Sequence, residues 1–110
     1  MEINKETESQ IRELQIFEQN LQQVMMQKQT FELELSEVDN AIEELAKAND
    51  EVYKIAGNIM IKTSKENLLK DIKQKKDLIA LRIKALNSQE KNLQETSDSL
   101  REKVLSKIKQ

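Results

Sequence analysis

The sequence contains no cysteine, histidine, proline or tryptophan, and it has a single glycine, Gly57. Without cysteine or histidine the chain can form neither a disulfide nor a Cys/His zinc site, and it has no histidine for acid–base or nucleophilic catalysis. One glycine cannot build a glycine-rich phosphate-binding loop. The sequence therefore predicts no catalytic site, no metal site, no cofactor and no enzyme activity.

Long apolar runs and a strong charge of one sign are also missing. No apolar run approaches the ~20 residues that cross a bilayer, and the first residues lack the apolar core of a signal peptide, so we expect a cytoplasmic chain without membrane contact. The net charge of −2 does not suggest nucleic-acid binding.

Hydrophobic residues make up only 37% of the chain. This low content favours either one elongated helical unit that spans residues 1–110, or disorder, rather than a round core.

Strong helix formers dominate the rest of the composition, with one exception around Gly57. There, β-branched residues flank a Gly-Asn pair, which is a signal for a β-hairpin turn. We predict strands over 52–56 and 59–63, between helices over about 5–49 and 64–109. Thr63, followed by Glu66, is the expected cap of the second helix.

Apolar residues recur with heptad spacing in both predicted helices, which is typical of a coiled coil. In the first helix all but one of the a and d positions are apolar; they are Leu14, Phe17, Leu21, Val24, Lys28, Phe31, Leu35, Val38, Ile42 and Leu45. In the second helix every d position is apolar, and the a and d positions are Leu69, Ile72, Lys76, Ile79, Ile83, Leu86, Glu90, Leu93, Ser97 and Leu100.

The two heptad patterns are mirror images about Gly57. When the chain folds back there, Leu14 lies opposite Leu100 and Leu45 opposite Leu69, because each pair is equally far from Gly57 in the sequence. The same rule gives four mixed layers: Phe17–Ser97, Val24–Glu90, Lys28–Leu86 and Val38–Lys76. Charge supports the same pairing: residues 1–49 hold eleven acidic and four basic residues, net −7, whereas residues 64–110 hold seven acidic and twelve basic residues, net +5. Opposite charges favour an intramolecular antiparallel pair over a parallel homodimer.

The predicted hairpin is too small to be stable alone in water, and its two edges would carry unpaired backbone groups. One interpretation is that hairpins from several subunits join into a sheet or a closed barrel. The other is an ordinary loop packed on the helix ends. We favour the first, so the expected fold is mainly α, a long antiparallel two-helix coiled coil joined by a short β-hairpin that assembles into an oligomeric β-barrel.

The coiled-coil pattern weakens toward the chain ends. The a and d residues form a seam between the two helices. Beyond the Leu14–Leu100 layer the next layers are Gln10–Val104 and Thr7–Lys107, so we expect the packing of the seam to end there. Apolar side chains left off the seam, or facing a poor partner, suit weak binding of other apolar chains; these are Ile11, Ile16, Phe17, Leu105 and Ile108. The alternative is that single exposed apolar residues carry no function.

Several short segments, taken in order, resemble the β-class subunits of the prefoldin family, the archaeal ones especially. They are Gln27-Lys28-Gln29-Thr30, Glu43-Glu44-Leu45, Val52-Tyr53-Lys54 and Gly57-Asn58-Ile59-Met60-Ile61-Lys62. The resemblance implies a hexamer of two α and four β subunits, with a β-barrel platform and six coiled coils. It also implies an ATP-independent chaperone that holds unfolded proteins at the coiled-coil tips and passes them to a group II chaperonin.

The same resemblance implies an assembly surface on the hairpin. Its residues in this chain are Val52, Tyr53, Ile55, Gly57, Ile59, Met60 and Ile61.

A second hypothesis is a structural coiled-coil adaptor or tether, which needs the same helices but no promiscuous binding of unfolded proteins. Such an adaptor would have one stoichiometric partner.

Overall fold

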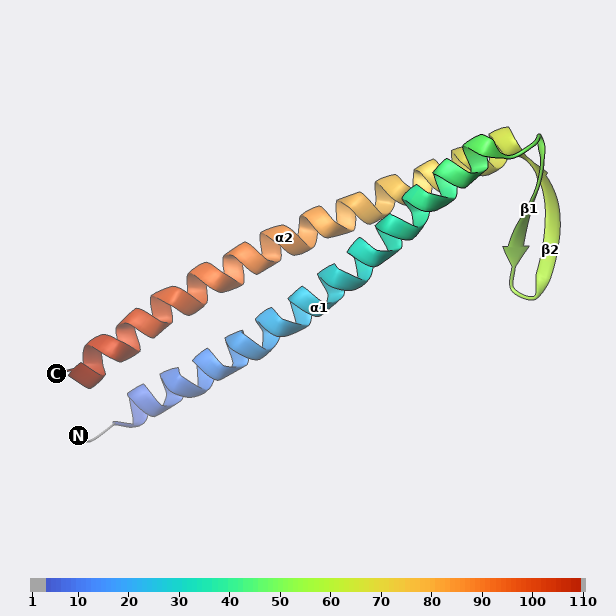
Figure 1. The fold of residues 1–110 in the computed structure, drawn as a ribbon. Helices are drawn as coiled ribbons and strands as arrows, with labels where there is room; N and C mark the ends of the chain where they lie inside the picture. Colours follow the sequence, from blue (N-terminus) through green and yellow to red (C-terminus); the bar gives the residue numbers. More distant parts are fainter. Residues whose placement is uncertain (1–3, 110) are drawn as a thin grey trace. The chain divides into compact units, whose positions relative to one another are not determined.

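The computed structural model describes residues 4–109. Along the chain, one β-hairpin separates two long helices. The order is α1 (Lys5–Lys47), β1 (Glu51–Ala56), β2 (Ile59–Ser64) and α2 (Lys65–Lys109), as Figure 1 shows. This confirms the predicted fold of two antiparallel helices joined by a hairpin. No helix within the described residues is long and apolar enough to span a bilayer.

Backbone contacts divide the chain into two compact units. The terminal unit comprises residues 1–29 and 84–110, and the hairpin unit comprises residues 30–83. Each unit contains one segment of α1 and one of α2, and the hairpin belongs to the second. Within each unit the two helical segments run antiparallel, side by side (Figure 1).

Both ends of α1 are capped by side chains. The backbone N–H of Thr7 donates to Oδ1 of Asn4 at 2.8 Å, which satisfies one of the free donors at the helix start. At the other end, Nζ of Lys65 donates to the carbonyl oxygens of Ala46 and Ala48 at 3.0 and 3.2 Å. A lysine at this place satisfies free carbonyls and interacts favourably with the helix dipole.

The cap of α2 is Ser64, so the prediction of Thr63 is wrong. Oγ of Ser64 accepts a hydrogen bond from the backbone N–H of Asn67 at 3.1 Å, three residues along the chain. Thr63 is instead the cross-strand partner of Val52, and β2 continues through Ser64. Because the strand extends by one residue, the helix starts one residue later than the capping-box pattern indicated.

The hairpin has a two-residue turn at Gly57-Asn58. β1 and β2 pair antiparallel from Glu51–Ser64 to Ala56–Ile59. Gly57 has a φ of 62°, and no non-glycine residue in the described chain has a positive φ. A positive φ at the first turn position alone matches a type II′ turn, in which glycine is the preferred residue.

The predicted heptad seam is the core of both units. None of the predicted a and d positions is exposed. In the hairpin unit the most buried of them are Val38, Leu45 and Ile79, and in the terminal unit they are Val24, Leu86 and Ser97. Each unit therefore buries a narrow stripe between two helices, as expected from the low apolar content.

Candidate functional site

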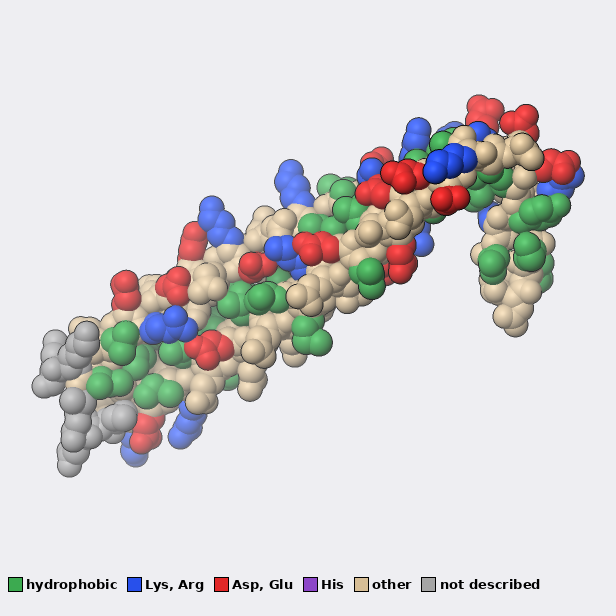
Figure 2. Space-filling view, viewed as in Figure 1, with side chains coloured by type: hydrophobic (Ala, Val, Ile, Leu, Met, Phe, Trp, Pro, Cys, Tyr) green, Lys and Arg blue, Asp and Glu red, His purple; other side chains and the backbone are tan. Residues whose placement is uncertain are grey.

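The two faces of the hairpin both carry apolar side chains. Cross-strand partners share a face and alternate along the strands. One face carries the pairs Tyr53–Lys62 and Ile55–Met60, and the other carries Val52–Thr63, Lys54–Ile61 and Ala56–Ile59. Figure 2 shows green apolar side chains on the side of the hairpin that faces the viewer.

Most of the predicted assembly residues are exposed and lie together. Ile55 is 76% exposed, Ile59 and Met60 are each 66% exposed, and Tyr53 and Ile61 are also exposed. Within the described chain the sheet has only these two strands, so both of its edges carry unpaired backbone groups. Val52 differs from the rest, because it is already buried at the base of the hairpin.

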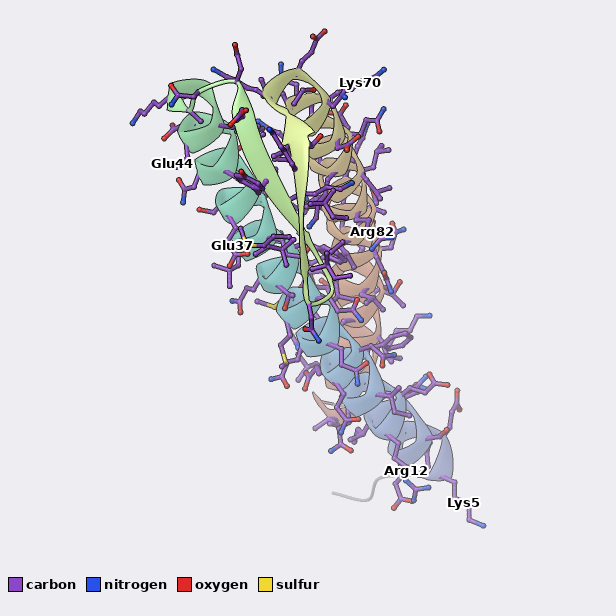
Figure 3. The ribbon with its side chains drawn as sticks, turned by 90° about the vertical axis from the view of Figure 1, so that its right-hand side faces the viewer. Lys5, Arg12, Glu37, Glu44, Lys70 and Arg82 are labelled. Carbon is purple, nitrogen blue, oxygen red and sulfur yellow. The ribbon has the colours of Figure 1, made fainter. Side chains whose placement is uncertain are left out.

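In the hairpin unit, complementary charges flank the helix pair. Nζ of Lys76, at a seam position, lies 2.8 Å from Oδ1 of Asp39. The hydrogen bond to Asp39, together with the charge of this carboxylate, raises the pKa of Lys76 above 10.5. Figure 3 shows Glu37 and Glu44 extending from α1 on one side, and Lys70 extending from α2 on the other.

In the terminal unit, ion pairs cross the helix pair at three levels. Nζ of Lys28 lies 3.3 Å from Oε2 of Glu90, and these are polar seam residues from neighbouring layers. The heptad pattern places each residue opposite an apolar one and does not predict the pair. The signal for the pair in the sequence is two opposite charges in neighbouring layers. Glu18 pairs with Arg101 at 2.9 Å, and Glu6 pairs with Lys107 at 3.1 Å.

The seam continues closer to the chain ends than expected. Thr7 and Val104 are buried and Gln10 is half-buried, so the prediction that the seam fails beyond Leu14–Leu100 is wrong. Lys107 explains the difference, since its ammonium group pairs with Glu6 and donates to Oε1 of Gln10 at 3.3 Å. A long lysine side chain can keep its charge in water and still close a helix pair.

The predicted client-binding residues fall into two groups. Ile16 is 55% exposed and Leu105 is 46% exposed. Ile11, Phe17 and Ile108 are half-buried, so only part of each side chain faces solvent. All five belong to the terminal unit.

A groove of about 420 Å³ lies beside Phe17 in the terminal unit. Phe17 and Leu100 are its large apolar residues, and the other lining residues are Glu13, Glu95, Thr96, Ser99 and Lys103. The heptad pattern assigns Leu100 to the seam only and predicts no role for Glu13 or Lys103. The available signal was the predicted layer of Phe17 and Ser97, in which a large side chain faces a small one.

Comparisons with known proteins agree with this architecture. The family model described as "Prefoldin subunit" matches residues 8–110. The chain is 34% identical to the prefoldin subunit beta of Pyrococcus furiosus, over 93% of this chain and 89% of the relative. It is 36% identical to the prefoldin subunit beta of Archaeoglobus fulgidus, over 94% of this chain and 90% of the relative.

A solved structure shows the same fold. The crystal structure of the prefoldin beta subunit from Thermococcus strain KS-1 matches with a TM-score of 0.92 and 32% sequence identity. The match covers 99% of this chain and 97% of that one. The chain therefore belongs to the prefoldin family of chaperone subunits and is of the archaeal β type.

Proposed function

We propose that this chain is a subunit of an ATP-independent holdase that binds unfolded proteins and passes them to a group II chaperonin. In this proposal the hairpins join this chain to α-type subunits, in a hexamer of two α and four β subunits. The terminal units hold the clients. The cytoplasm, as expected from the sequence, is the proposed location.

The observation that carries the proposal is the exposed apolar surface on both faces of an unpaired hairpin. A two-stranded sheet is marginal in water, and its open edges can pair with strands of another subunit. Fully burying one exposed Ile or Met side chain contributes roughly 1.5–3 kcal/mol. Ile55, Ile59 and Met60 together supply enough apolar surface to drive assembly once the strand edges are also paired.

Client binding is proposed to rest on many weak contacts. The exposed Ile16 and Leu105, with the partly exposed Ile11, Phe17 and Ile108, offer small apolar areas in each terminal unit. Several such units on one platform raise the effective concentration of binding sites, so no single contact needs high affinity. Weak contacts of this kind also tolerate clients of many sequences.

The hairpin is tested by charge substitution. The variant Ile55→Lys/Met60→Lys is mixed with an α-type subunit, and its mass is measured by analytical ultracentrifugation. We expect the variant to remain unassembled while its helix content by circular dichroism is unchanged. Leu81→Lys is the matched control, because Leu81 is 64% exposed on a helix outside the hairpin. A variant that still assembles would exclude the hairpin as the assembly surface.

Holdase activity is tested on the assembled complex. Without ATP, the complex should suppress the aggregation of several unrelated unfolded proteins, and Ile16→Asp/Leu105→Asp should reduce this protection while the assembled mass stays the same. The adaptor hypothesis predicts no protection of unrelated proteins and one stoichiometric partner. Absence of protection by the unmodified complex would therefore favour the adaptor.

A further inference from the structure

The two edges of the seam beside Phe17 differ. In an antiparallel pair, e positions face e positions and g positions face g positions. On the e side, Arg101 and Glu18 form an ion pair at 2.9 Å. On the g side, Glu13 and Lys103 line the open groove instead. One edge of this level is therefore closed by a salt bridge, and the other is open.

Small side chains on α2 explain why the groove exists. Ser97, the predicted partner of Phe17, is only 1% exposed, and Thr96 and Ser99 line the groove with short side chains. The hydroxyl of Ser97 has no hydrogen-bond partner within the described residues. Thus Phe17 and Leu100 have no other large apolar side chain beside them in the groove, and a volume of about 420 Å³ falls in the range of ligand sites, about 300–1,000 Å³.

The charges on the rim indicate which kind of chain would bind. Glu13, Glu95 and Lys103 line the groove, and none of them forms an ion pair with another described side chain. Two carboxylates against one ammonium give the rim a net negative charge. Glu95 and Lys103 are two helical turns apart on α2, roughly 12 Å, which is the length of about four residues of extended chain.

We propose that this groove binds one bulky apolar side chain of an extended client segment in which a neighbouring residue is lysine or arginine. The apolar side chain contacts Phe17 and Leu100, and the basic neighbour lies toward Glu95, at the end of the groove away from Lys103. Lys103 disfavours a second basic residue at the other end of the segment. This inference rests on the proposed holdase function and specifies the class of segment that the terminal unit binds.

The first test fills the groove. Ser99→Trp places a large ring at the exposed rim, away from the seam, and Ser88→Trp is the matched control on the outer surface of the same helix. The probes are fluorescein-labelled peptides with one central Phe, preceded or followed by one Lys, and binding to the assembled complex is measured by fluorescence anisotropy. We expect Ser99→Trp to weaken binding of at least one lysine peptide about tenfold, as loss of one buried apolar contact would. Unchanged affinity, or equal loss in Ser88→Trp, overturns the proposal.

The second test removes the rim charge without changing the volume of the groove. Glu13→Gln/Glu95→Gln should reduce the preference for Lys over Glu beside the Phe about threefold to tenfold, and it should leave the preference for Phe over Ala intact. Glu43→Gln/Glu44→Gln is the control, because these exposed glutamates lie in the hairpin unit. A full charge preference in the groove variant contradicts the assignment of the basic neighbour.

The outcomes separate this inference from the proposed function. If the unmodified complex suppresses aggregation and Ser99→Trp does so equally well, the groove is not a client site, although the holdase function stands. If the unmodified complex gives no protection, the proposed function itself fails. A change in assembled mass caused by Ser99→Trp would assign the groove to a contact with a second copy of the chain and overturn the proposal.

Discussion

The hairpin unit and the terminal unit share one heptad pattern but differ in what they leave exposed. In the hairpin unit most of the large exposed apolar side chains lie on the strands, where Ile55, Ile59 and Met60 are beside open sheet edges. In the terminal unit they are scattered along the helices, and Ile16 is an example. A concentrated surface with backbone pairing suits one specific, permanent partner, whereas scattered apolar residues suit many transient ones.

The seams of the two units also differ. Phe31–Ile83, Leu35–Ile79 and Leu45–Leu69 are predicted layers of the hairpin unit that are wholly apolar. Among the predicted a and d positions, the hairpin unit has one polar seam residue, Lys76, whereas the terminal unit has three, Lys28, Glu90 and Ser97. Polar layers weaken the helix pair but fix its register. The same heptad repeat therefore gives a mostly apolar seam in one unit and a seam with several polar residues beside a groove in the other.

The largest expected effect comes from the apolar seam of the hairpin unit. Ile79 is only 3% exposed, so Ile79→Ala should lower the free energy of unfolding by about 2–5 kcal/mol through lost burial and the cavity left behind. Leu93→Ala is the counterpart in the terminal unit, where the side chain is half-buried, and its effect should be smaller. Urea unfolding at fixed protein concentration measures both changes in the free energy of unfolding. An equal or larger loss for Leu93→Ala would contradict the expectation that the seam contributes more stability in the hairpin unit.

A backbone effect at the hairpin turn comes next. Gly57→Ala should lower the free energy of unfolding by about 1–2 kcal/mol, because an alanine at a φ of 62° is strained. The space around Gly57 is open, because no atom beyond Gly57 and its two chain neighbours lies within 4 Å of an added Cβ, so no clash with the rest of the chain contributes. Thermal unfolding at fixed protein concentration checks the change. Asn58→Ala is the control, since Asn58 has no positive φ.

Ser97→Ala should act in the opposite direction. The substitution removes a buried hydroxyl that has no hydrogen-bond partner in the described chain, so the free energy of unfolding should rise by about 1 kcal/mol. Ser99→Ala is the matched control, because Ser99 is exposed on the same helix. Destabilisation by Ser97→Ala in urea unfolding would mean that the hydroxyl has a partner after all.

The polar pair in the terminal seam gives a smaller effect. The side chains of Lys28 and Glu90 are 28% and 34% exposed, so solvent screens their attraction. A double-mutant cycle with Lys28→Met and Glu90→Gln should give a coupling energy of about 0.5–1 kcal/mol. The same cycle for Asp39→Asn and Lys76→Met, whose side chains are 48% and 44% exposed, should give less. The reverse order would show that polar seam contacts matter more in the hairpin unit.

The pH dependence gives the smallest signal. Because pairing with Asp39 raises the pKa of Lys76 above 10.5, the folded state binds its proton more tightly than the unfolded state does. The resulting stabilisation is present below pH 10.5 and is lost as the pH rises through the raised pKa of Lys76. Thermal unfolding across this range should show a steeper loss in the unmodified chain than in Asp39→Asn, and identical profiles would contradict the shift.

Much of the fold was predictable from the sequence, because local rules govern it. Heptad spacing determines which side of a helix is apolar, and a single glycine between β-branched residues marks the turn. The mirror relation of the two patterns about Gly57 then selects antiparallel pairing, and the opposite net charges of the two halves reinforce it. The predicted assembly residues also follow from local pattern, since strand residues beside a tight turn have little of their own chain to cover them.

Other features depend on contacts between side chains that are distant in the sequence, and these contacts become visible only once the chain is folded. The burial of Val52, the continued seam at Thr7 and the open groove between Phe17 and Leu100 are examples. A periodic pattern says which residues face the partner helix, but it does not say how far each side chain reaches or which charges meet. The sequence determined the pairing of the helices; the lengths and charges of side chains brought together by that pairing determined where the pair is closed and where it stays open.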